Sequence, residues 1–536
     1  MAAFPLPPVE LSEPEPPRPK RRGRKATVAV SVAVLIVAVI AILASRWWPF
    51  DQRSIIQKLQ EASDSQVQAQ NFHRTYLPSP GCVLEKVVFT RGNAEHPLII
   101  IDKLTIRATY TGMLRHHVSQ MIADGMKVSI PEVGNGHAFS PKPSNITIDE
   151  ITTKDAILEF ARKSEHAPLR FDIHAISLRN VGWSGPLSYE VKMHNPDPPA
   201  EITASGKFGV WNQGDVGKTP VSGEYKLEQA DLSIYGGIAG MLSSTGKFSG
   251  NLGHIDVSGK TDTPDFEVKS GGHTVDLMTE YTAYVNGTNG DTFLRRVDAY
   301  FRNTHIVADG SVAKFENDKG KTARINLSAR KGRIEDLLGL FVKKSPPPMS
   351  GAVSLQAKAE LPPGKAPFLS KLVLQGNFEI GGGEFPDPST QESVDKLSAG
   401  ARGEGHSDDD PETVLTDLAG RVALVNGVAS FPDITFGVPG AKARLRGTYN
   451  LLNQKIDLRG QMKVDTQIAN TTTGVKSLLL RVMGPFFKKR KRGGQILPVK
   501  IGGTYEKPTF GLDLQDKQAG TVPKPYTNRA GVTRRD

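Results

Sequence analysis

The chain has 536 residues, a formal net charge of +11 and one cysteine. This length is sufficient for a large hydrophobic core, and a single cysteine excludes a framework of internal disulfides. The excess positive charge is concentrated in Lys20–Lys25, Lys488–Arg492 and Arg534–Arg535, and the rest of the chain is nearly balanced. Because it has no basic stripe with interleaved aromatic residues, we expect no nucleic-acid partner.

The most apolar segment is Ala26–Ala44 (ATVAVSVAVLIVAVIAILA), which contains no charge. At about 1.5 Å per residue it covers roughly 28 Å, close to the ~30 Å hydrocarbon core of a bilayer. The basic cluster Lys20–Lys25 precedes it, and Trp47 and Trp48 follow it. Basic flanks stay in the cytoplasm and tryptophans favour the membrane interface, so we predict a single-pass anchor with the large domain on the outer side.

Residues 1–25 are rich in proline and end in the basic cluster, which predicts a disordered cytoplasmic tail. A cleaved signal peptide is the alternative to an anchor. Its apolar region would span 7–15 residues and end at a small-residue cleavage site. The run in this chain is longer, and Arg46-Trp47-Trp48-Pro49 is a poor cleavage site. The sequence therefore favours an uncleaved anchor.

After the anchor the chain changes from helical to strand periodicity. A juxtamembrane helix is predicted over residues 50–72, where Ile55, Leu59 and Ala62 recur at helical spacing. Apolar and polar residues alternate from there almost to the end, as in strands with one face shielded from water. The clearest runs are Val353–Glu360, Ile325–Ala329, Ala441–Tyr449, Ile456–Val464 and Val499–Tyr505.

Turn signals such as Asn286-Gly287, Asn289-Gly290 and Asn426-Gly427 separate the strands, which predicts a long antiparallel meander of roughly 25 strands. Stacked sandwiches or propeller blades are alternatives, but blades would need a repeat of roughly 40–50 residues that the chain does not show. The apolar residues are mostly small or medium-sized. We therefore predict a mainly β fold: one long, curled antiparallel sheet that forms an open groove, with few short helices. At ~4.8 Å per strand it would span on the order of 120 Å.

Two helical patterns interrupt the meander, at Ile334–Phe341 and Val475–Phe487. We divide the sheet into an N-terminal part over 73–345 and a C-terminal part over 346–514, followed by a disordered basic tail over 515–536. The second helical pattern runs directly into a basic cluster, which could contact anionic lipid at a membrane interface or be a solvated loop. The candidate lipid contacts are Lys488, Lys489, Arg490, Lys491 and Arg492.

Catalytic motifs are missing from the sequence: it contains no GxSxG, HExxH, Walker A or CxxC pattern. His116 and His117 are adjacent and so do not share a face. The acidic loop 404–412 could hold a cation but lacks the spacing of a calcium loop. A lone cysteine is usually a small buried apolar residue, and we expect this of Cys82. We expect a protein without catalytic residues, cofactor or metal.

Glycine and strand patterning recur in three groups of segments. They are Thr75–Cys82 with Leu84–Thr90, then Gly206–Gly209, Ser222–Tyr225 and Leu252–Phe266, and finally Gly447–Val464, Leu497–Tyr505 and Lys507-Pro508. In this patterning the chain resembles the AsmA-like proteins of bacterial envelopes, including the AsmA/TamB type with a repeating β-groove. The resemblance covers about Ile55 to Leu514 and does not extend to the Pro-rich tail or the acidic loop.

This resemblance implies an inner-membrane protein with a periplasmic β-groove that supports phospholipid transfer toward the outer membrane. Membrane phospholipids are then the expected partners. The alternative is a non-enzymatic assembly factor that acts on outer-membrane proteins through protein contacts. Candidate groove-lining residues lie on the apolar faces of the predicted strands, where the alternative is a closed dry core. They are Ile202, Ala204, Phe208, Val210, Ala443, Leu445, Ile456, Leu458, Met462, Val464, Val499 and Ile501.

Overall fold

The computed structural model describes residues 50–90, 97–130, 146–160, 169–386, 416–464 and 496–512, with gaps of one to four residues inside these ranges. They form one open, mainly antiparallel sheet of 25 strands with few short helices. The prediction of a mainly β fold built on one long sheet is confirmed to this extent. No described helix is long and apolar enough to span a bilayer, and the predicted anchor over 26–44 lies outside the described residues.

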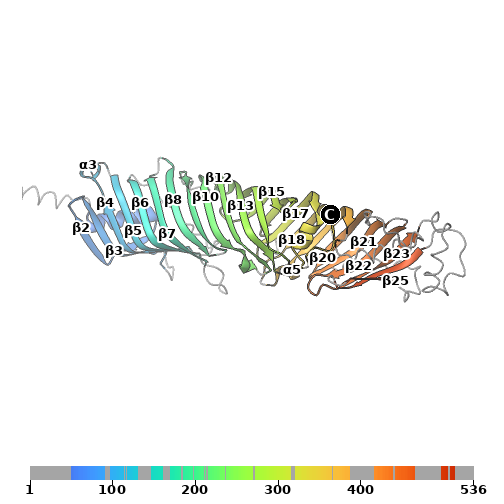
Figure 1. The fold of residues 1–536 in the computed structure, drawn as a ribbon. Coiled ribbons are helices and arrows are strands. Elements are labelled where there is room, and N and C mark those ends of the chain that lie inside the picture. The colour runs from blue at the N-terminus through green and yellow to red at the C-terminus, as the bar shows by residue number, and fades with distance from the viewer. Residues whose placement is uncertain are drawn as a thin grey trace, which may run out of the picture.

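The first half of the chain forms the N-terminal end and the middle of the sheet (Figure 1). Its elements are α2 (Gln52–Ser63), β1 (Gln66–Gln68), β2 (Asn71–Thr75), β3 (Gly81–Thr90), β4 (Ile99–Arg107), α3 (Tyr110–Met113), β5 (His117–Ile130), β6 (Thr147–Phe160), β7 (Leu169–Val181), β8 (Leu187–Pro196), β9 (Pro199–Phe208), η1 (Val216–Lys218), β10 (Pro220–Asp231), η2 (Leu232–Tyr235), β11 (Ile238–Ala239), β12 (Met241–Asn251) and β13 (His254–Val268).

The second half continues the same sheet to its C-terminal end. Its elements are β14 (Val275–Val285), β15 (Thr292–Phe301), β16 (Thr304–Ala313), β17 (Thr322–Arg333), α4 (Ile334–Gly339), β18 (Ser350–Leu361), α5 (Phe368–Lys371), β19 (Val373–Glu384), β20 (Thr416–Val425), β21 (Val428–Val438), β22 (Ala441–Asn450), β23 (Ile456–Val464), β24 (Ile496–Gly503) and β25 (Pro508–Leu512).

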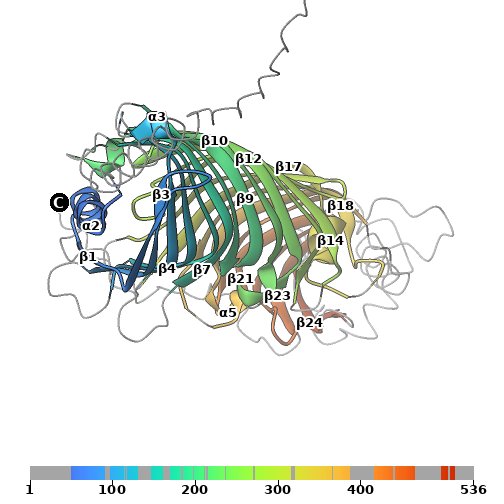
Figure 2. The same ribbon diagram turned by 90° about the vertical axis from the view of Figure 1, so that its left-hand side faces the viewer.

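The sheet is a long row of strands, each paired mainly with its neighbours in sequence. Among the described pairings one is parallel, that of β5 with β6. Viewed along the row, the strands are bowed, and α2 lies on the inner side of the bow (Figure 2). Since Phe50 and Ile55 of this N-terminal segment pack against Leu84 and Leu104, the face that carries these leucines is the concave one.

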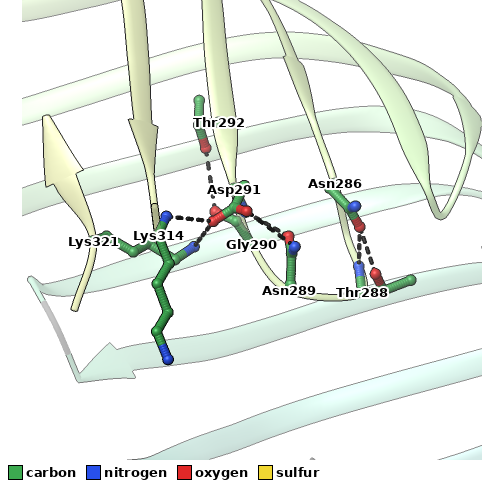
Figure 3. Close-up of polar contacts among 8 residues, drawn as sticks. All are labelled: Asn286, Thr288, Asn289, Gly290, Asp291, Thr292, Lys314 and Lys321. Carbon is green, nitrogen blue, oxygen red and sulfur yellow. Dashed lines mark hydrogen bonds and ion pairs between the residues drawn. The ribbon is translucent and has the colours of Figure 1, made fainter. Parts of the chain in front are cut away.

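The β14–β15 and β20–β21 turns contain the asparagine–glycine signals expected from the sequence, and Figure 3 shows the first of them. The Asn286 side-chain oxygen accepts hydrogen bonds from the Thr288 N–H (3.0 Å) and hydroxyl (2.5 Å). The Asn289 side-chain oxygen accepts from the Asp291 N–H at 2.9 Å, and the Asp291 carboxylate accepts from the Lys314 N–H at 3.2 Å. The side chains of Asn286, Asn289 and Asp291 therefore accept hydrogen bonds from backbone N–H groups in and beside this turn.

The predicted juxtamembrane helix is shorter than expected. The prediction covers residues 50–72, whereas α2 ends at Ser63 and the following residue, Asp64, has a left-handed conformation with φ of 49°. The chain then forms β1, in which Val67 is 3 % exposed and pairs with Phe89 of β3. Pairing and burial of Val67 in the sheet outweigh the helical periodicity of the segment, because tertiary contacts override local propensity.

Two clusters of buried residues lie at the two ends of the sheet. The N-terminal cluster joins α2 and β1 to β3–β5 and includes Cys82, Leu84 and Leu104. The C-terminal cluster joins β18–β24, with Ile334 and Leu337 of α4 packed against it. No cluster of this kind covers the strands between them in the described part of the chain.

Candidate functional site: the apolar face of the sheet

The strand register places apolar or uncharged residues opposite one another along almost the whole sheet. Directly paired residues of neighbouring strands project from the same face. We define the apolar face as the face on which these residues lie. One line of direct pairs runs from β2 to β20 through Phe72, Leu84, Leu104, Ala123, Thr153, Ile176, Val191, Ala204, Tyr225, Gly246, Gly259, Tyr281, Val297, Ala308, Leu327, Ala357, Gly376 and Val422.

A second line continues the apolar face to the C-terminal end through Phe378, Gly420, Ile434, Leu445, Gly460 and Val499. Neither line contains a charged residue. A one-residue slip of any strand would expose its apolar set and bury its charged set, so the register is strongly specified by this pattern.

The apolar face is open in the middle of the sheet. Between β7 and β17 most of its large side chains are half-buried rather than buried, although neighbouring strands cover their flanks. Examples are Ile176, Val191, Ile202, Leu227, Phe248, Val257, Ile306, Ile325 and Leu327. A residue covered only by its neighbours in the sheet and not by a second layer has this intermediate exposure. An extended apolar molecule could therefore lie on these strands.

At the C-terminal end the apolar face is closed by the protein itself. Of the groove-lining candidates, Ala443, Leu445, Met462 and Val499 are between 2 % and 8 % exposed and belong to the C-terminal cluster. Leu458 and Ile501 pack against this cluster, and Ile456 is half-buried. These residues share the apolar face, but the buried ones form a dry core.

The candidates on β9 lie in the open middle. Ile202, Ala204 and Phe208 are half-buried on the apolar face and pair with Leu227, Tyr225 and Val221 of β10. Val210 is 43 % exposed and lies beyond the end of β9, so it is not part of the strand face. Val464 is the last residue of β23, where its backbone is opposite Ala441.

Tyrosine rings cover glycines in the middle of the apolar face. A Cβ atom at Gly223 would lie 2.6 Å from the Tyr189 hydroxyl, and one at Gly246 would lie 2.6 Å from the Tyr225 ring. A Cβ at Gly259 would lie 2.9 Å from the Tyr281 hydroxyl. Glycine in a strand interior commonly marks such close approach. The rings of Tyr189, Tyr225 and Tyr281 therefore lie over the backbone of these glycines, and we call these three residues the tyrosine floor.

The hydroxyl groups of this tyrosine floor bond to one another. Tyr225 and Tyr281 share a hydrogen bond, and Tyr225 also contacts the Ser244 hydroxyl at 3.1 Å. Burial, reinforced by the bond to Tyr225, raises the pKa of Tyr281, and burial raises the pKa of Tyr189. The floor is therefore uncharged at neutral pH, and its polar atoms are already paired.

The opposite face carries the charges. Lys247 pairs with Glu224 at 2.7 Å, and Lys260 with Glu280 at 2.5 Å. Arg296 binds Asp298 through two bonds and, with His305, lowers the Asp298 pKa to about 2. A hollow of about 740 Å³ lies along β9–β15. Its lining includes the charged residues Glu224, Lys247, Lys260, Glu280, Arg296 and Asp298 together with Ala204, Tyr225, Gly246, Gly259 and Tyr281 of the apolar line.

Several other candidates lie outside the described residues: Trp47 and Trp48, the basic cluster Lys488–Arg492, and the acidic loop 404–412. His117 is described and contacts Thr147 and Asp149, at 2.8 and 2.9 Å. The described ranges contain no group of three or more potential metal ligands. Cys82 is fully buried, and this burial raises its pKa to about 12, so its thiol is unreactive at neutral pH.

Sequence reasoning missed the tyrosine floor. Tyr225 and Tyr281 are far apart in sequence and meet only because β10, β12, β13 and β14 pair in a particular register. A glycine opposite a tyrosine in adjacent alternating strands is the signal that could have located it.

Comparison with known proteins identifies no relative. No family model matches the chain, and searches of the curated proteins and of the solved structures both found no match.

Proposed function

We propose that this protein shields the acyl chains of phospholipids as they pass along its apolar face, from the inner membrane toward the outer membrane. The proposal rests on the uncharged line of paired residues that runs from β2 to β20. The apolar face on which this line lies is not covered by a second layer of described residues between β7 and β17. The predicted anchor would hold the N-terminal end of the sheet at the inner membrane. The resemblance to AsmA-like proteins implies transfer from there toward the outer membrane. In this proposal the domain lies in the periplasm of a bacterial cell.

The energetic reason is the cost of exposing methylene groups. Each one transferred from lipid to water costs ~0.8 kcal/mol, so a whole acyl chain cannot leave the bilayer unassisted at a useful rate. A continuous apolar surface reduces this cost at every position along the path. The charged head group would stay in water beyond the edge of the sheet.

The shape of the surface favours movement over tight binding. The open middle is lined by half-buried aliphatic side chains and by the tyrosine floor, whose hydroxyls already have partners. A passing chain thus meets no charge on the two lines of paired residues, and over the tyrosine floor it meets hydroxyls that already have partners. Contacts are individually weak and similar from strand to strand, which suits a ligand that slides.

The two closed ends restrict where a lipid can enter. Phe50 and Ile55 cover the apolar face over β3–β5, and α4 packs against it near β18. Lipids would therefore reach the face from the side, over the edge of the strands that follow the N-terminal cluster.

Aspartates on the open apolar face are expected to remove bound lipid. In residues 50–536 produced without the preceding segment, we expect co-purifying phospholipid by mass spectrometry. The double variant Ile202→Asp with Val257→Asp should lose most of it, because a buried carboxylate beside an acyl chain is strongly unfavourable. Thr203 and Ser258 are the exposed neighbours on the opposite face. Thr203→Asp with Ser258→Asp is the matched control and should retain the lipid.

A folded domain that contains no lipid would contradict the proposal and favour the alternative, an assembly factor that acts on outer-membrane proteins through protein contacts. Equal lipid in both double variants would show that the bound lipid lies elsewhere. Circular dichroism establishes that each variant is folded.

A further inference from the structure

A patch of exposed large apolar side chains lies at the N-terminal end of the sheet, where the chain enters the fold. Leu77 is 82 % exposed, Tyr110 51 % and Tyr76 43 %. Tyr76 and Leu77 belong to the β2–β3 turn, and Tyr110 begins α3 in the β4–β5 connection, at the edge of the sheet in Figure 1. We call these three residues the end patch.

Hydrogen bonds hold the two loops of the end patch together. The Tyr110 hydroxyl donates to the Tyr76 carbonyl oxygen at 2.6 Å, and the Ala108 N–H donates to the Pro80 carbonyl oxygen at 2.8 Å. The exposed side chains are thus presented by a fixed scaffold. Exposed Arg115 lies in the same connection as Tyr110.

The end patch is tied to the point where the preceding segment joins the domain. Asp51, the N-cap of α2, pairs with Arg74 at 2.7 Å, two residues before Tyr76. Five residues lie between Ala44, the end of the predicted anchor, and Phe50, so the two are joined by six residue steps. At ~3.3–3.6 Å per residue they reach at most about 20 Å.

We infer that the end patch inserts into the head-group layer of the membrane that holds the anchor, and that it seats the sheet on that membrane. This rests on the anchor in the proposed function. Tyrosine has an apolar ring and a polar tip and favours the interface, a leucine side chain reaches deeper, and an arginine can contact anionic head groups. The short reach from Ala44 makes the membrane the surface closest to the patch.

Seating at this patch gives the sheet an orientation. The edge at the β2–β3 turn and α3 faces the bilayer, and the open strands after the N-terminal cluster begin close to it. A lipid that leaves the bilayer then has a short path to the apolar face at β7, where its open part begins.

Site-directed spin labelling tests this inference on the full chain in vesicles of phosphatidylethanolamine and phosphatidylglycerol. Buried Cys82 does not react, so Leu77→Cys provides a single labelling site. The label at 77 should be more accessible to oxygen, which concentrates in the bilayer, than to a water-soluble nickel complex. Leu452, which is 57 % exposed in the β22–β23 turn, is the matched control. A label at Leu452→Cys should show the reverse.

An aqueous profile at 77 in protein that floats with the vesicles would overturn the end patch as a membrane contact and favour a protein partner for it. Protein that does not float would overturn both the anchor and the patch. Neither outcome depends on lipid bound to the apolar face, so failure of this inference is distinguishable from failure of the transfer function.

Discussion

Replacing Leu445 by alanine is expected to lower the local free energy of unfolding by roughly 2–5 kcal/mol, the usual range for a large core residue. Leu445 is 2 % exposed and lies at the centre of the C-terminal cluster, beside Ala443, Met462 and Val499. Each strand of the sheet contacts mainly its neighbours, so the loss should be local, as in repeat proteins. Amide hydrogen exchange should accelerate in β21–β23 and stay unchanged in β3–β5.

Arg444→Ala is the matched control, because its exposed side chain projects from the opposite face of the same strand. Its effect should be within about 0.5 kcal/mol. Unchanged exchange in β21–β23 of Leu445→Ala would mean that the C-terminal apolar face is not a packed core. Because Leu445 and Met462 are buried in this cluster, a charge at either position is expected to disrupt folding.

Asp336→Ala is the second large effect, with an expected loss of about 1–3 kcal/mol, since it removes the carboxylate acceptor of the buried Thr304 hydroxyl and of the Asn303 N–H. Asp336 of α4 is 3 % exposed. Its carboxylate accepts hydrogen bonds from the Asn303 N–H at 3.0 Å and the Thr304 hydroxyl at 2.8 Å, in the β15–β16 turn. The bonds hold α4 where Ile334 and Leu337 pack against the C-terminal cluster.

Thermal unfolding and hydrogen exchange at the Asn303 amide measure this loss. Asp336→Asn keeps a side-chain acceptor and should lose less stability than Asp336→Ala. If Asp336→Ala unfolds at the wild-type temperature with unchanged exchange at Asn303, these two bonds do not position α4.

The individual strands follow from alternation in the sequence, because period-two patterning directly reports which residues share a face. The run Ile456–Val464 is a strand with those same bounds, and Ala441–Tyr449 differs from β22 by one residue. These runs also place residues correctly on the apolar face, where Ala443 pairs with Met462 and Leu458 with Ile501.

Which parts of that face are open does not follow from alternation. Ile202 and Leu445 occupy equivalent positions in their strands, yet one is half-buried and the other buried. The difference arises because Leu445 belongs to the C-terminal cluster, against which Ile334 and Leu337 of α4 pack. The position of α4 depends on Asp336 and the β15–β16 turn. The parallel pairing of β5 with β6 likewise depends on the path of the chain between them and not on the pattern within either strand.

Photocrosslinking in cells tests the central claim most directly, because it asks which face of the sheet touches lipid. A photoreactive phenylalanine replaces Ile202, Val257 or Ile325 on the apolar face, or their neighbours Thr203, Ser258 or Arg324 on the charged face. We predict phospholipid adducts, identified by mass spectrometry, at the first three positions and not at the second three. Adducts at all six positions, or at none while the protein is folded and abundant, would contradict it.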